Sequence, residues 1–130
     1  MSEVTVGTEL PTFTQKAELA TSIAYAAASG DLNPLHWDPA FAANVSPTGG
    51  VIAHGMYAMG LASRLVTSWA GDPAKVAEVR VRFTKPWPLG ETATFGGTVT
   101  AVEGGIATVE VWATREDGEA TVKGTARVRL

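Results

Sequence analysis

The sequence lacks cysteine altogether and has only two histidines among its 130 residues. A disulfide framework and a zinc site with thiolate ligands are therefore excluded. Two histidines are also too few for a His-rich metal cluster. We accordingly expect no metal catalysis.

Charged residues are scarce as well, because they make up 18% of the chain, and the formal net charge is −3. The Lys and Arg residues are scattered singly, so we expect no basic stripe and no nucleic-acid partner. The sequence also lacks an apolar run of membrane-spanning length and a signal peptide. Hydrophobic residues still account for 45% of the chain, which is enough for one core. We therefore expect a single cytoplasmic domain over residues 1–130, without a membrane partner.

Two segments in the first half of the chain have helical periodicity. Residues 15–28 carry an apolar stripe, with Thr14 as the expected cap and Gly30 as the residue that ends the helix. Residues 54–69 contain one Arg and otherwise small or apolar residues, so a helix there must be enclosed. Between the two helices, residues 31–50 are rich in Asp, Asn, Pro, Ser and Gly, which predicts an irregular connection.

After the second helix the periodicity changes from 3.6 to two residues. Apolar residues alternate with polar ones in four runs, which predict strands near residues 79–83, 93–99, 107–113 and 122–128. Gly104–Gly105 and Asp117–Gly118 lie between these runs and suit tight hairpin turns. The last sixty residues are therefore expected to form an antiparallel meander. Together with the apolar helix, this predicts an α+β architecture in which the sheet curls around the helix.

The first candidate for chemistry is a carboxylate and an imidazole, those of Asp31 and His36, five residues apart. Pro34 disfavours the α conformation at Asn33, so the chain bends and both side chains can point at one small volume. A histidine exchanges protons near neutral pH, and an aspartate can hold or activate a water molecule. The alternative is that Asp31 and Asn33 only form a turn and that His36 packs beside Trp37.

The second candidate opens the apolar helix over residues 54–69. Gly55 would lie in the first turn, where backbone N–H groups are free, so it can stabilise an oxyanion on a carbonyl substrate. Alternatively, Gly55 only permits close packing of the helix on the sheet. His54 is expected to be structural, with a backbone partner near the helix start. Ser63, about two turns further along a similar face, can donate to Asp31 or merely fill a small gap.

Two short segments resemble those of a known family. Ser29–His36 reads SGDLNPLH, and Ala53–Met56 reads AHGM. In this order they resemble the MaoC-like (R)-specific hydratases and dehydratases, and the likeness extends over nearly the whole chain. Around Trp37, Met59–Gly60 and residues 67–73, the chain looks closest to the catalytic beta subunit of the actinobacterial (3R)-hydroxyacyl-ACP dehydratase.

This resemblance implies a hot-dog fold, in which an antiparallel sheet wraps around a central helix. It implies that Asp31 and His36 catalyse the reversible dehydration of (3R)-hydroxyacyl thioesters to trans-2-enoyl thioesters, without a cofactor. The N–H of Gly55 would bind the thioester oxygen, Ser63 would orient the aspartate, and Asn33 would lie among the substrate contacts. The thioester carrier would be CoA or acyl carrier protein. The chain would form a homodimer, or a heterodimer with a sister hot-dog subunit.

Two other functions are compatible with a hot-dog fold. One is hydrolysis of acyl thioesters, but the spacing of Asp, Asn-Pro and His suits addition of water better. The other is a non-catalytic acyl-binding partner subunit, and the presence of both Asp31 and His36 argues against it. The sequence indicates neither the acyl length nor the direction of the reaction.

Overall fold

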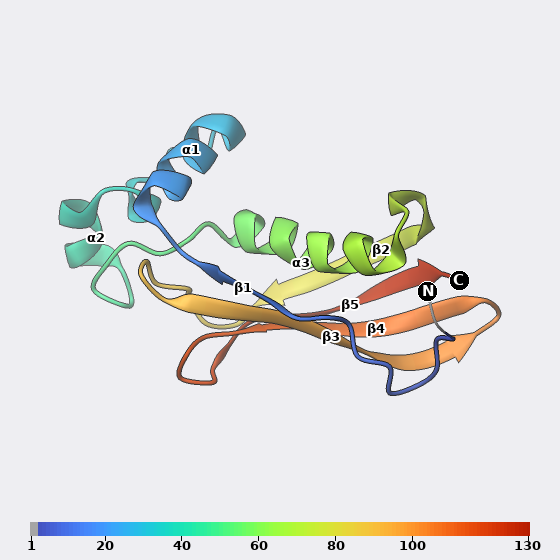
Figure 1. Cartoon of the computed structure of the whole chain (residues 1–130). Helices are drawn as coiled ribbons and strands as arrows, with labels where there is room; N and C mark the ends of the chain where they lie inside the picture. Colours follow the sequence, from blue (N-terminus) through green and yellow to red (C-terminus); the bar gives the residue numbers. More distant parts are fainter. Residues whose placement is uncertain (1–2) are drawn as a thin grey trace.

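A five-stranded antiparallel sheet curves along one long helix in the computed structural model, which describes residues 3–130 (Figure 1). The long helix is α3 (Gly55–Ala70), and the shorter helices α1 (Leu19–Ser29) and α2 (Pro39–Val45) lie beyond its N-terminal end. The strands are β1 (Phe13–Lys16), β2 (Val76–Phe83), β3 (Thr92–Glu103), β4 (Ile106–Thr114) and β5 (Ala120–Arg129). The predicted α+β hot-dog fold is confirmed.

The strands lie in the order β1-β3-β4-β5-β2. Tight turns join β3 to β4 and β4 to β5, and Gly104, Gly105 and Gly118 in these turns have φ values of 60°, 74° and 85°. The predicted meander is thus confirmed for β3, β4 and β5. The expectation that β2 belongs to the same meander is wrong, because β2 pairs with β5 and not with β3, which follows it in the chain. Pairing with β5 makes β2 an edge strand.

Helix α3 packs one face against the sheet. The apolar residues of this face include Leu61, Leu65 and Val66, all buried. Leu65 and Val66 share one core cluster with Val109 and Val128 of the sheet, and Leu61 belongs to a second cluster with Val122. Burial of this apolar surface stabilises the fold. The helix is not enclosed on all sides, since part of its other face remains exposed in the single chain.

Helix α1 begins later than the sequence predicts. Thr14 does not cap it, because Thr14 lies in β1, opposite Thr94 of β3. Strand pairing therefore outweighs helical periodicity at this end, and the helix starts at Leu19 without a side-chain cap. Its C-terminal end agrees with the prediction, since Gly30 has a φ of 78° and its N–H donates to the carbonyl of Ala26.

The connection from α1 to α3 is compact. It contains the 3₁₀ turn η1 (Pro34–His36) and helix α2, whose first residues are both prolines. Its last residues run beside residues 87–89: the N–H of Ala53 donates to the carbonyl of Trp87 at 2.8 Å, and that of Leu89 donates to Val51 at 3.0 Å. This short ribbon holds the start of α3 in place. Among residues 3–130, no helix is long and apolar enough to cross a membrane.

Candidate active site

Asp31 lies in the turn directly after α1. Its Oδ1 accepts a hydrogen bond from the backbone N–H of Asn33 at 3.3 Å, so the carboxylate stabilises its own turn. The side chain of Asn33 in turn accepts from the N–H of Leu35 at 3.0 Å and caps η1. Asp31 is exposed, which leaves its carboxylate accessible to a substrate. Asn33 has a local structural task here, and its predicted contact with a substrate stays a prediction.

His36 ends η1, and a hydrogen bond assigns its tautomer. Its Nδ1 lies 2.8 Å from the carbonyl oxygen of Ile52. A carbonyl oxygen only accepts hydrogen bonds, so Nδ1 carries the proton. In the neutral ring, Nε2 is then the unprotonated nitrogen, which is the atom that can accept a proton from water or substrate.

His54 is the residue immediately before α3 and is buried, with 2% of its surface exposed. Its Nε2 lies 3.2 Å from the backbone carbonyl oxygen of Asp31. The imidazole also stacks on that of His36, with ring centroids 4.1 Å apart and planes inclined by 25°. The expected backbone partner of His54 near the helix start is therefore present, and it belongs to the turn that carries Asp31.

The fold thus brings Asp31, His36 and His54 into one cluster. One side-chain ligand atom of each residue lies within 4.8 Å of those of the other two. Three such groups suggest a metal site, and the carbonyl hydrogen bond on one nitrogen of each ring leaves the other nitrogen free, as in metal-bound histidines. The two rings are stacked, however, and the in-plane lone pairs of stacked rings do not converge on one point, as metal coordination requires. The arrangement fits an acid/base pair supported by a second imidazole.

A cleft of about 250 Å³ adjoins the cluster, and both His36 and Gly55 line it. Gly55 is the first residue of α3, so its N–H belongs to the first turn, which has no intrahelical acceptors. A Cβ atom at this position would lie 3.0 Å from the ring of Phe83. The glycine therefore lets the Phe83 ring pack close to the first turn of α3, and the role of the Gly55 N–H in oxyanion binding stays a prediction.

Ser63 does not join this cluster. It lies eight residues after Gly55, which is about 12 Å along the helix axis. Within residues 3–130 its hydroxyl donates to the carbonyl of Met59 at 3.0 Å, one turn earlier in the same helix. The predicted hydrogen bond to Asp31 is not formed in the single chain, because the serine satisfies its donor locally.

Three further residues of the cleft were not identified from the sequence. Phe83 ends β2, Trp87 lies in the following loop, and Thr121 is in β5; all three line the cleft. Trp87 and Thr121 are buried, with 3% of the surface of each exposed. The available signal was the pair of aromatic residues at the end of β2 and in the loop after it, but strand pairing alone brings Thr121 to them.

A row of aromatic rings packs against the cluster of Asp31, His36 and His54 through the ring of His54. Tyr25 of α1 lies 4.7 Å from the ring of His54 and 5.6 Å from that of Tyr57, measured between ring centroids. Tyr57 stacks on Trp87 at 6.0 Å. Burial raises the pKa of the Tyr57 phenol, which keeps it protonated at neutral pH. The row joins α1 and α3 to the loop that closes the cleft.

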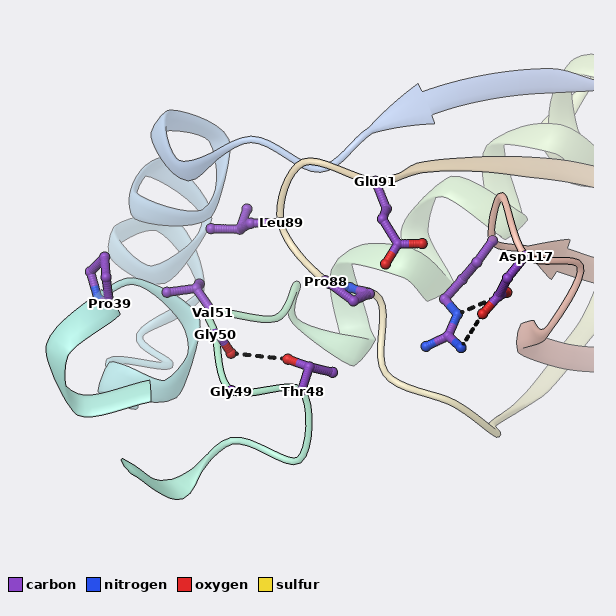
Figure 2. A pocket seen from close by; sticks show the side chains of 10 residues that line it. Pro39, Thr48, Gly49, Gly50, Val51, Pro88, Leu89, Glu91 and Asp117 are labelled. Atoms are coloured by element: carbon purple, nitrogen blue, oxygen red, sulfur yellow. Dashed lines mark hydrogen bonds and ion pairs between the residues drawn. The ribbon is translucent and has the colours of Figure 1, made fainter. Parts of the chain in front are cut away.

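Figure 2 shows a second, larger hollow of about 560 Å³, formed by the loops near Gly49 and Pro88. Its charged wall contains Glu91 and the ion pair of Arg115 with Asp117, whose N–O distance is 2.7 Å. The hydrogen bond from Arg115 lowers the pKa of the Asp117 carboxyl, and the same bond raises the pKa of Arg115. The size of this hollow does not make it the active site, since neither member of the acid/base pair lines it.

Comparison with solved structures finds proteins named as hydratases that share this fold. The "(R)-hydratase from A. caviae involved in PHA biosynthesis" has a TM-score of 0.89 and 31% sequence identity, covering 100% of this chain and 99% of that chain. A chain of the ChsH1-ChsH2 complex from Mycobacterium tuberculosis has a TM-score of 0.88 and 29% identity, with 98% and 99% coverage. The fold is therefore shared over the full length of both neighbours.

Curated relatives agree with these structures but match over shorter segments. The 3-oxo-4,17-pregnadiene-20-carboxyl-CoA hydratase beta subunit of Mycobacterium tuberculosis is 46% identical over 52 residues, which is 40% of each chain. The probable enoyl-CoA hydratase 2 of Dictyostelium discoideum is 41% identical over 76 residues, or 55% of this chain and 24% of that one. The matches thus span less than half the length of these relatives.

The model of the family described as "MaoC like domain" matches residues 3–123. The chain belongs to the MaoC-like domain family, as its paired motifs predicted.

Proposed function

We propose that the protein interconverts (3R)-hydroxyacyl and trans-2-enoyl thioesters by removal or addition of water. The observation that carries this proposal is the proximity of the Asp31 carboxylate to the ring of His36, which keeps Nε2 free and lines a cleft together with Gly55. The names of the relatives, which include an (R)-hydratase and an enoyl-CoA hydratase, support the same reaction.

In the hydration direction, Asp31 and His36 hold a water molecule against C3 of the enoyl thioester. The pair accepts one proton from this water as its oxygen bonds to C3, and one proton is delivered to C2 on the same face. Negative charge accumulates on the thioester oxygen during the addition, and the N–H of Gly55 stabilises it. The pair ends in the protonation state in which it began, and dehydration is the same path reversed.

The exposed apolar surface supports a dimer as the active form. Large apolar residues of α1, the following turn, α3 and β2 are exposed by half or more: Ile23 51%, Leu32 64%, Met56 59% and Phe83 51%. Phe83 also lines the cleft, and Met56 follows the cleft residue Gly55 in the chain. In addition, β2 leaves one sheet edge unpaired in the single chain. A second hot-dog subunit, identical or a sister chain, would cover both, and the acyl chain of a CoA or acyl-carrier-protein thioester would lie along the interface.

The experiment that tests the function uses enoyl-CoA substrates of four to sixteen carbons with the wild-type protein and Asp31→Asn. The asparagine keeps an acceptor for the N–H of Asn33 but removes the base, so hydration is expected to fall about a hundredfold or more. Asp38→Asn is the matched control. Asp38 caps α2 through Ala40, and an asparagine can replace this cap, so that variant should retain its activity.

Other outcomes would identify the alternative functions. Release of free CoA thiol without hydration would indicate a thioester hydrolase. Binding of an acyl thioester without turnover, by wild-type protein and Asp31→Asn alike, would indicate a non-catalytic acyl-binding subunit. Near-native hydration by Asp31→Asn would contradict the assigned role of the carboxylate.

A further inference from the structure

His54 makes two contacts with the acid/base pair, one to each member. Its Nε2 lies 3.2 Å from the backbone oxygen of Asp31, 23 residues earlier in the chain. Its ring stacks on His36 at 4.1 Å. The first contact holds the turn that carries the carboxylate, and the second holds the plane of the reactive imidazole.

The surroundings of His54 allow only one of its two tautomers. The Asp31 carbonyl only accepts, so Nε2 is the protonated nitrogen. The other nitrogen, Nδ1, is buried and has no hydrogen-bond partner among residues 3–130. A second proton on Nδ1 would place an N–H group in a buried position without an acceptor and a positive charge against the ring of His36. The neutral Nε2–H tautomer is therefore the form that this site accommodates.

Few other charged or titratable groups face the two rings. The ring of Tyr25 packs against that of His54 at a tilt, and the carboxylate of Asp31 belongs to the cluster itself. The ammonium group of Lys85 belongs to the wall of the same cleft as both rings. None of these groups is bonded to Nδ1 of His54, so the ring is held by its Nε2 hydrogen bond and by stacking.

We propose that His54 is a positioning residue for the reaction, which acts as a neutral hydrogen-bond donor to the Asp31 backbone and as a stacking platform for His36. This inference rests on the proposed hydratase function. The sequence predicted only a structural role for His54. The proposal adds a role in positioning, because His54 contacts Asp31 and His36, the two residues proposed to exchange protons with the substrate. Loss of either contact moves a reacting group, and small displacements at such groups lower turnover strongly.

Two variants separate the two contacts. His54→Gln keeps an N–H donor near the place of Nε2 and removes the ring, whereas His54→Phe keeps a stacking ring and removes the donor. We expect His54→Phe to lower kcat for hydration of crotonyl-CoA by about tenfold to a hundredfold, with a much smaller change in KM. His54→Gln should recover part of this loss. Val99→Ala is the stability control, because Val99 is buried in the core cluster that does not contain the cleft residues.

A purely structural role would give a different result. Both His54 variants would then lower the thermal midpoint, as Val99→Ala does, while the folded protein kept the wild-type kcat. That outcome would overturn the proposal. A kcat loss in His54→Phe that exceeds the loss in an equally destabilised Val99→Ala supports it.

Nitrogen-15 NMR of the imidazoles provides a readout that needs no substrate. The chain contains only two histidines, so both rings can be assigned. At neutral pH we expect the Nε2–H tautomer for His54 and the Nδ1–H tautomer for His36. His36 should keep its single tautomer in His54→Phe, which retains a stacking ring, and lose it in His54→Gln, which removes the ring. The reverse tautomer at His54 would overturn the proposal. Correct tautomers in a protein that turns over no thioester would contradict the proposed function and leave the positioning of the rings established.

Discussion

Replacement of Gly55 by alanine tests whether the N-terminus of α3 acts on the substrate or only packs against the sheet. The added Cβ would lie 3.0 to 3.2 Å from three carbon atoms of the Phe83 ring. Phe83 is 51% exposed, so its ring can move by the few tenths of an ångström that the methyl group needs. The substitution therefore places a methyl group beside the first N–H groups of the helix with little strain.

The expected effects on stability and on activity differ in size. Alanine is favoured over glycine in a helix by up to about 1 kcal/mol, and the shift of the Phe83 ring offsets part of this gain. The free energy of unfolding should therefore change by less than about 1 kcal/mol. The proposed oxyanion role, however, requires a thioester oxygen to approach the N–H of Gly55, and we expect the added methyl group to hinder that approach. Loss of one oxyanion donor costs about 2.7 to 4 kcal/mol of transition-state stabilisation, or roughly a 10² to 10³-fold loss in kcat.

The assay pairs urea unfolding with hydration of crotonyl-CoA. Gly60→Ala is the matched control, because it makes the same change in the same helix and its Cβ would meet no atom within 4 Å. That variant should be as stable as the wild type or slightly more stable, with unchanged activity. Retention of kcat/KM within about threefold in Gly55→Ala, at wild-type stability, would refute the role of Gly55 in binding the oxyanion.

Two further predictions concern the sheet and its edge. Gly124→Ala should destabilise the fold by about 3 kcal/mol or more, because its Cβ would collide with the backbone oxygen of Arg80 in the paired strand. Urea unfolding measures this loss, and a change below about 1 kcal/mol would contradict the register of β2 against β5. Light scattering should find a dimer, because the outer edge of β2 is unpaired and the apolar side chains of Ile23 and Met56 are exposed in the single chain. A fully active monomer would contradict this interface.

Most of the secondary structure could be predicted from local patterns. The period-two runs identify β2 to β5, and the small and apolar residues before Gly71 identify α3, because these signals arise within each element. Strand β1 was missed, and the start of α1 was placed too early. Residues 13–16 are strand because they pair with β3, eighty residues away, and no local pattern contains that partner.

The position of β2 shows the same limit. Its alternation predicts a strand, but not a neighbour, and sequence proximity favours pairing with β3. The structure places β2 against β5, where Gly124 allows the backbone of Arg80 to approach closely. Only the assembled sheet shows why that residue is a glycine.

For the site, the sequence by itself predicted that Asp31 and His36 lie together, because they are five residues apart around a proline and their proximity is a local property of the chain. Tertiary structure alone decided which nitrogen of each histidine carries the proton, since the carbonyl partners lie 16 residues from His36 and 23 residues from His54. It also decided that Ser63 donates within its own helix. The chain supplies the reactive groups locally, and long-range hydrogen bonds and stacking set their orientation and protonation, because these contacts form only when distant segments pack together.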